Sequence, residues 1–445
     1  MRAVCAGWVI VSADDVRRDA AVLFDDVQIA DVMDAAELRR RLGTGEVSLT
    51  EVLERPGAVV FPGFVNAHEH QYGVLSHGIP QGRNITDFDG FLRSYWWPAI
   101  EDRIRKEQVV ATSRFTMTEM IRSGVTAFCD TLEAPYCEPD TLVEQGELVE
   151  DAGMRAVVSL ESSERADEEN GEACLLRNIG AVDHFASRDG LVRGAVCTHT
   201  TFTCPERMIA HAAELAREHD AMLQFHLSES RYERDWTRSH LGCEPVDVYE
   251  RVGALGPDVL ASQCVKVSPR ERATLLAHGV RTAHMPISNC EVGGGFAPVP
   301  EMLAEGFAPA LGTDGYVNDF FQVMRAACLV HKASHETTAV MPAREVFRMA
   351  TCNGARAMGL ADVGTLEPGM SADLVVYEDG QPTPITEGNI FDQLVIFGNR
   401  GNVRDVYVAG RALLDDGELT TIDEEAARAR MRTCADRFWR GTSDE

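Results

Sequence analysis

The stretch "FPGFVNAHEHQYG" (residues 61–73) places two histidines one residue apart, directly after a short apolar run. Side chains two positions apart in an extended segment point to the same side, so His68 and His70 face the same way. A polar loop would also explain this pattern. If the segment is instead the first strand of a barrel, both imidazoles lie at its carboxyl end and can bind one metal ion. The rest of the chain decides between these interpretations.

Short apolar runs resembling β-strands recur through the middle of the chain. The eight runs span 58–65, 125–131, 155–161, 191–199, 222–227, 259–265, 280–285 and 308–313. Segments with helical spacing of apolar residues lie between most of them, as at 106–124 and 205–219. Eight strands that alternate with helices predict an α/β fold, a (β/α)8 TIM barrel. A doubly wound sheet is the alternative, but no G-x-G-x-x-G follows the first strand.

The two ends of the chain carry strand and turn patterns with few helices. We therefore expect residues 1–57 and 366–445 to build one small β-sandwich domain together, beside a barrel formed by residues 58–365. The C-terminal part also contains an amphipathic helix at about 423–440, which we expect to pack on the outside.

The composition of the 445 residues excludes several classes of partner. A formal charge of −28 argues against nucleic acid, because phosphate binding needs a basic surface. No run of about 18 uncharged apolar residues predicts a membrane span. No secretion signal opens the chain, and the twelve cysteines include no C-x-x-C, so we expect reduced thiols and a cytoplasmic protein. Acids are abundant and lysines few, which fits either a high-salt cytoplasm or a GC-rich genome.

Polar residues that suit a metal site fall at the ends of separate predicted strands. They are His68, His70, His199, His226, Glu229, His284 and Asp314. A lone strand histidine is usually a hydrogen-bonded core residue, and an isolated Asp-Gly is usually a turn. Because a barrel brings its strand ends together, their coincidence favours a shared site. Three imidazoles and a carboxylate suit zinc, or else iron or manganese.

Five segments carry a resemblance to a known family. They are PGFVNAHEH (62–70), HLSE (226–229), AHMPISN (283–289), LGTDG (311–315) and LEPGMSADLVVYE (366–378). Together they resemble the amidohydrolase superfamily, and best its mononuclear branch of chlorohydrolases and aminohydrolases. That branch includes the methylthioadenosine/S-adenosylhomocysteine deaminases and a selenium-linked aminohydrolase group.

The resemblance implies a role for each matching residue. The set His68, His70, His226 and Asp314 would hold one divalent ion, zinc before iron or manganese. Asp314 would accept a proton from metal-bound water, and Glu229 would protonate a ring nitrogen of the substrate. His199 and His284 match positions that contact the substrate.

One position departs from the family pattern. The sixth strand of the family typically reads L-A-H-C-V-H, whereas this chain has LASQCVK (260–266), with Gln263 at the first histidine position. An amide can donate and accept hydrogen bonds but cannot titrate as an acid or base. Gln263 can therefore polarise water or substrate, belong to a site with an unusual substrate or metal, or mark a weakened activity.

These features predict a metal-dependent hydrolase that cleaves a C–N bond of a nitrogen heterocycle, chiefly by deamination. Purines, pyrimidines, pterins and triazines are the candidate substrates. Dehalogenation or cyclic-amide hydrolysis would use the same machinery. An inactive, metal-stabilised scaffold is the alternative from another class, motivated by Gln263. The family leads us to expect a homo-oligomer, although the sequence contains no pattern that identifies an interface.

Overall fold

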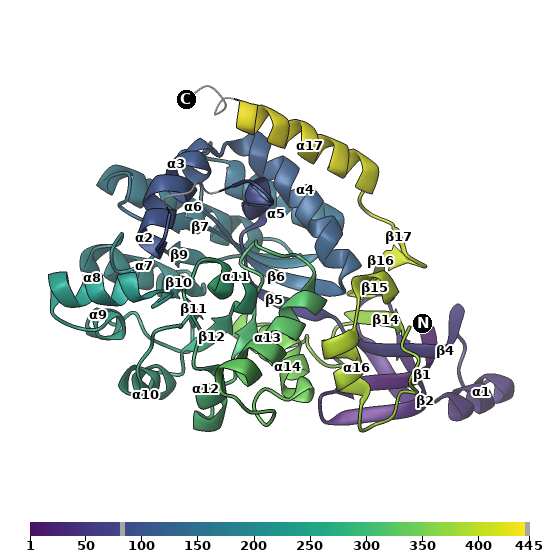
Figure 1. Cartoon of the computed structure of the whole chain (residues 1–445). Helices are drawn as coiled ribbons and strands as arrows, with labels where there is room; N and C mark the ends of the chain where they lie inside the picture. The colour runs from purple at the N-terminus through teal and green to yellow at the C-terminus, as the bar shows by residue number, and fades with distance from the viewer. Residues whose placement is uncertain (81–84, 441–445) are drawn as a thin grey trace.

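The computed structural model describes residues 1–80 and 85–440, which form two sheets and their covering helices (Figure 1). Across these residues, no helix combines the length and apolar character needed to cross a membrane.

The side chain of Arg93 is exposed, and its Nε donates a hydrogen bond to Asp89 Oδ1 at 2.6 Å.

The larger sheet is the predicted barrel. Its strands are β5 (Phe64–Glu69), β6 (Val125–Leu132), β7 (Arg155–Ser162), β8 (Val192–Gly194), β9 (Val196–Thr198), β10 (Leu223–Leu227), β11 (Val259–Gln263), β12 (Arg281–His284) and β13 (Ala310–Leu311). They pair in parallel in the order β13-β12-β11-β10-β9-β7-β6-β5, with β8 beside β7. The ring closes where the backbone N–H of Thr313 donates to His68 O at 3.0 Å. This arrangement confirms the expected fold class.

Helices surround the barrel (Figure 1). The main ones are α4 (Lys106–Arg122), α5 (Thr141–Ala152), α6 (Glu168–Ala186), α7 (Glu206–Glu218), α8 (Arg231–Leu241), α10 (Pro269–Ala277), α13 (Phe320–Ser334), α14 (Ala343–Ala350) and α15 (Cys352–Ala357). Local sequence sets their ends. Helix α10 begins with a capping box, in which Ser268 Oγ accepts from the N–H of Glu271 and Pro269 occupies the first turn.

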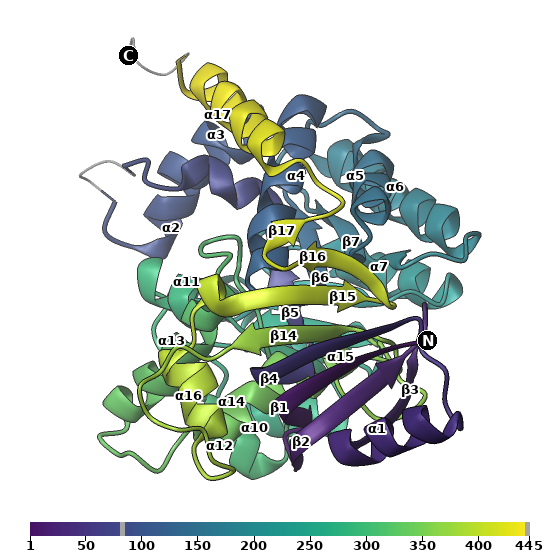
Figure 2. The same cartoon turned by 90° about the vertical axis from the view of Figure 1, so that its right-hand side faces the viewer.

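The smaller sheet joins both ends of the chain (Figure 2). It contains β1 (Arg2–Ser12), β2 (Asp15–Phe24), β3 (Ile29–Asp34), β4 (Glu51–Pro62), β14 (Leu374–Glu378), β15 (Val403–Val408), β16 (Arg411–Asp415) and β17 (Glu418–Leu419). The C-terminal β14 pairs antiparallel with the N-terminal β4. Between the sheets, Arg155 of β7 forms a buried ion pair with Asp373 at 3.3 Å.

Aromatic side chains fill the junction between the two sheets. The Phe61 and Phe64 rings stack with their centroids 5.1 Å apart, although they belong to different sheets. Phe347 of α14 meets Phe64 edge-on at 6.2 Å. Buried aromatic surface of this kind dominates core energetics, so the junction fixes how β5 leaves the small sheet.

The run at 58–65, expected to be one strand, is shared between the two sheets. β4 ends at Pro62 and β5 begins at Phe64, with Gly63 between them. A Cβ at Gly63 would lie 2.1 Å from Thr126 Oγ1, so the chain can pass β6 here only without a side chain. The apolar run continued across the boundary because both segments are buried, which hides the break from the hydrophobic pattern.

The C-terminal helix α17 (Glu424–Arg440) lies along α4 on the outside of the barrel (Figures 1 and 2). The Arg103 guanidinium lies 4.3 Å from the Phe438 ring centroid. Trp439 Nε1 donates to Leu75 O at 2.8 Å, in the short helix η1 (Gln71–Ser76) that follows His70. The helix therefore braces the segment leading away from the two histidines.

Candidate metal centre and active site

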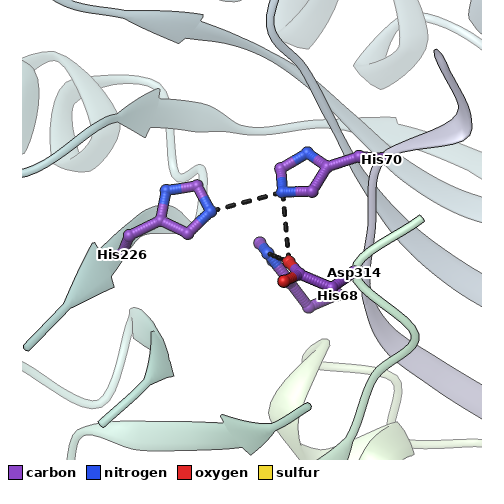
Figure 3. Close-up of side chains that lie close together, drawn as sticks. All are labelled: His68, His70, His226 and Asp314. Atoms are coloured by element: carbon purple, nitrogen blue, oxygen red, sulfur yellow. Dashed lines mark hydrogen bonds and ion pairs between the residues drawn. The ribbon is translucent and has the colours of Figure 1, made fainter. Parts of the chain in front are cut away.

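Four predicted ligands converge at the carboxyl end of the barrel (Figure 3). His68 lies in β5 and His70 directly follows it, His226 lies in β10, and Asp314 follows β13. Asp314 Oδ1 lies 2.9 Å from His68 Nε2 and 3.2 Å from His70 Nε2. His226 Nε2 lies 3.3 Å from His70 Nε2. One potential ligand atom from each residue falls within 4.8 Å of all the others.

The donor atoms of this group fit a bound cation. Within the described residues, Asp314 Oδ1 and both ring nitrogens of His68 are buried without a hydrogen-bond partner. Buried polar atoms normally have partners, and His68 Nε2 faces Asp314 Oδ1 at 2.9 Å, so these two atoms suit binding to one cation. Three imidazole nitrogens and a carboxylate oxygen form a site for a divalent metal ion.

The surroundings favour the metal-binding forms of His68, His226 and Asp314. Burial lowers the pKa of His68, and of His226 even further, which favours neutral rings. Burial acts against ionised Asp314, yet the adjacent His68 and His70 hold its pKa well below the usual range. Burial acts against a charged His70, yet Glu133 and Asp314 raise its pKa well above the usual value, so a metal ion would displace a proton there. His70 Nδ1 lies 2.8 Å from Thr131 O, so this nitrogen carries the proton and Nε2 is left for the metal.

The loop that carries Asp314 is tied to β5. Thr313 N–H donates to Asn66 Oδ1 at 3.1 Å, and Asn66 Nδ2 donates to Thr313 Oγ1 at 2.8 Å. Asp314 itself adopts a left-handed φ of 62°, a conformation that costs about 1–3 kcal/mol for such a residue. A Cβ on the next residue, Gly315, would lie 2.2 Å from His70 O. The strained loop is thus held against the two histidines.

A cavity of about 560 Å³ opens above the four ligands. This is the size of ordinary small-molecule sites. One wall is aromatic and includes Phe88, Phe91, Tyr95 and Trp96. The carboxylates that line it are Glu101, Glu133, Glu229, Glu291 and Asp314, and none of its described lining residues is Lys or Arg.

Three of the other predicted site residues line this cavity. Glu229 is 8% exposed, and burial raises its pKa well above the usual value, which favours the protonated carboxyl. His199 has Nδ1 2.8 Å from Thr203 Oγ1, and burial lowers its pKa to about 4. Gln263 donates through Nε2 to Asp314 Oδ2 at 3.0 Å.

His284 lies elsewhere. It does not line the cavity, and its Nε2 lies 3.1 Å from His331 Nε2 on α13. The strand β12 ends at this residue, and its ring packs against α13 rather than over the metal ligands. The geometry gives no support to the expected substrate contact.

Two glutamates near the ligands were not anticipated from the sequence. Glu133 Oε1 is 4.0 Å from both His70 Nε2 and His226 Nε2, and Glu161 Oε2 is 4.0 Å from His226 Nδ1. Burial acts against ionised Glu133, yet the site histidines hold its pKa below the usual range, while burial and Glu133 raise the pKa of Glu161. Both follow apolar runs at strand ends, the same signal that identified the histidines.

Comparison with known proteins agrees with this site. Residues 59–413 match the sequence profile of the amidohydrolase family. The chain is 34% identical over 425 residues to the 5'-deoxyadenosine deaminase of Methanothermobacter thermautotrophicus, which covers 94% of each protein. It is 32% identical over 441 residues, or 96% of each, to the 5-methylthioadenosine/S-adenosylhomocysteine deaminase of Syntrophobacter fumaroxidans. The crystal structure of a Xanthomonas campestris adenosine deaminase with bound zinc superposes with a TM-score of 0.89, at 25% identity over 98% of both chains.

Proposed function

Because the chain belongs to the amidohydrolase family and is a metal-dependent deaminase of nitrogen heterocycles, we propose that it deaminates an adenine nucleoside modified at the 5' position. Candidate substrates are 5'-deoxyadenosine and 5'-methylthioadenosine, on which the named relatives act. The observation that carries this proposal is a complete ligand set that shares one cavity with the buried carboxyl of Glu229.

Zinc is the metal we propose, because nitrogen and oxygen donors in this number are typical of zinc sites. It also occupies the similar Xanthomonas structure. His68, His70, His226 and Asp314 would hold a divalent ion, whose contribution would be to activate water as a nucleophile near neutral pH.

Glu229 and Asp314 divide the proton transfers. Glu229 is neutral because of burial, so it can donate to the ring nitrogen next to the carbon that bears the amino group. Asp314 stays ionised, so it can accept the proton of the attacking water and pass one to the departing amine. The overall change adds water and releases ammonia, which converts the 6-aminopurine into a 6-oxopurine. Gln263 supports Asp314 by hydrogen bonding.

His199 and two carboxyl groups of the cavity, those of Glu101 and Glu133, would position the substrate. Thr203 holds Nδ1 of His199, which leaves Nε2 of a neutral ring to bind the base. Glu101 and Glu133 can accept hydrogen bonds from ribose hydroxyls. No described residue that lines the cavity is Lys or Arg, so the cavity suits a nucleoside and offers no cation to the phosphate of a nucleotide; Arg165, which pairs with Glu101 at 2.8 Å, lies outside this lining.

The similarity to deaminases over nearly the whole chain favours an enzyme over an inactive, metal-stabilised scaffold. A cytoplasmic location remains our proposal, supported by twelve cysteines that form no disulfide. A homo-oligomer also remains a prediction.

The test combines metal analysis with ammonia release. Purified protein should contain stoichiometric zinc, and the metal-loaded enzyme should release ammonia from 5'-deoxyadenosine or 5'-methylthioadenosine. Removal of the metal by a chelator should abolish turnover, and added zinc should restore it. Metal-loaded protein that leaves both nucleosides and adenosine unchanged would refute the proposal.

A further inference from the structure

The amide of Gln263 lies between two polar side chains at the end of β11. Its Nε2 donates to Asp314 Oδ2 at 3.0 Å, and its Oε1 accepts a hydrogen bond from Asn289 Nδ2. Gln263 and Asn289 are each 1% exposed, so water does not compete for these bonds. Asn289 belongs to α11 (Pro286–Glu291), which directly follows β12.

This arrangement determines which end of the amide faces Asp314. An ionised carboxylate only accepts hydrogen bonds, whereas an amide donates from one end and accepts at the other. A reversed Gln263 amide would press Oε1 against Asp314 Oδ2 and its NH2 group against the NH2 group of Asn289. Both contacts favour the observed orientation, and Asn289 is the partner that recognises its oxygen end.

The backbone holds Gln263 in a conformation that it would not adopt unaided. Its φ is 73° and that of Cys264 is 50°, both in the left-handed region. Such residues cost about 1–3 kcal/mol each and persist only where the surroundings over-determine them. The Cys264 N–H donates to Leu227 O at 2.8 Å, which fixes this turn to the neighbouring strand β10.

A second residue of α11 reaches the same carboxylate oxygen. Ser288 Oγ donates to Asp314 Oδ2, beside the bond from Gln263. The helix thus supplies two adjacent residues, one that contacts Asp314 directly and one that contacts it through Gln263. Both bonds end on the oxygen of Asp314 that does not face the histidines.

We propose that Asn289 is a positioning residue, which locks the Gln263 amide with its NH2 group toward Asp314 and so fixes the direction of Oδ2 during proton transfer. This role rests on the proposed function. It explains how a chain with glutamine at this position keeps a donor aimed at Asp314, since without a partner on its oxygen the amide would be oriented by Asp314 alone.

A double-mutant cycle tests the orientation. Asn289→Asp presents an acceptor to Gln263 and reverses its amide, so kcat should fall on the order of 100-fold, the effect of losing one oriented donor. KM should stay within about threefold of the parent value, since no substrate contact is removed. In the Gln263→His background, an imidazole can donate both to the introduced carboxylate and to Asp314, so the same substitution should cost less than about threefold. Equal losses in both backgrounds would overturn the proposal.

Two further variants keep the test decisive. Asn353→Asp makes the same change at another buried site, where Nδ2 donates only to Pro309 O, and it should leave kcat near the parent value. A comparable loss there would show that any buried aspartate impairs the enzyme. If Asn289→Asp does not fold, Asn289→Ala removes the donor without adding charge, and its loss of kcat should again depend on Gln263.

A measurement without turnover separates this proposal from the proposed function. Glutamine side chains labelled with ¹⁵N give an NH2 signal for Gln263, identified by its absence in Gln263→His. In metal-free protein, its exchange with solvent should be about fivefold or more faster in Asn289→Ala than in the parent, because the bond that holds the amide is lost. Unchanged exchange would overturn the positioning role even if the nucleosides are deaminated. Faster exchange would support it even if they are not.

Discussion

His68 and Asp314 lie at opposite ends of the barrel sequence, yet His68 Nε2 is 2.9 Å from Asp314 Oδ1. Their backbones also meet, since the Asp314 N–H donates to His68 O at 3.1 Å. The bond that helps to close the barrel therefore also assembles the metal centre. Any change that opens the β5–β13 junction should disturb the fold and the ligand geometry together.

Asp314→Asn should abolish turnover, by about 1000-fold or more, because the amide cannot accept the proton of the attacking water. The amide oxygen remains a possible ligand, so metal should still bind, although more weakly. Ammonia release and metal content measured on the same preparation separate the two effects. Near-normal activity would remove Asp314 from the mechanism.

Glu229→Gln should lower kcat by about 100- to 10,000-fold, because the neutral acid that protonates the ring is lost. Glu291→Gln is the matched control, since it removes a carboxylate from the same cavity at an exposed position. The control should retain activity within about threefold. Equal losses in the two variants would mean that the charge of the cavity matters and the proton donor does not.

Gln263→Leu should reduce kcat on the order of 100-fold, because Asp314 loses one of its two donors. Gln263→His should retain most of the turnover, since one ring nitrogen can donate to Asp314 while the other accepts from Asn289. Steady-state kinetics on one nucleoside compare the three enzymes. An active leucine variant would exclude the hydrogen bond from the mechanism.

Adenosine 5'-monophosphate should be a poor substrate, with kcat/KM about 100-fold or more below that of 5'-deoxyadenosine. The phosphate would find no Lys or Arg among the described residues that line the cavity, and it would meet the carboxylate of Glu133, whose pKa the site histidines hold below the usual range against the effect of burial. Both compounds share the reacting ring, so the ratio of their kcat/KM values reports how the cavity accepts the group at the 5' position. Comparable kcat/KM values for the two compounds would show that the carboxylates of the cavity do not affect binding of the 5' group of the substrate.

Gly63→Ala should destabilise the protein by about 1–3 kcal/mol, because its Cβ would overlap Thr126. Gly57→Ala is the control, since a Cβ there meets nothing within 4 Å. Denaturant unfolding of both variants measures the difference. Equal stability of the two variants would mean that Thr126 can shift to make room for the added methyl group at no cost in free energy.

The four metal ligands could be predicted because each has a local signal. His68, His70 and His226 lie in or at the end of short apolar strands, and Asp314 follows another. Parallel strands in a barrel bring such ends together, so periodicity and fold class group the seven candidate residues, and the resemblance to the amidohydrolases selects these four. The division of the 58–65 run at Gly63 had no such signal, since apolar residues continue on both sides.

The sequence by itself predicted the barrel and seven polar residues at its strand ends, because these depend on periodicity and strand order, while its resemblance to the amidohydrolases implied the four metal ligands and the class of reaction. Only the tertiary structure showed that Asn289 orients Gln263, that Glu133 and Glu161 approach the histidines, and that His284 faces His331. These relationships join side chains from different elements. They depend on helix placement and side-chain rotamers, which are set by packing throughout the core and leave no mark in any single stretch of sequence.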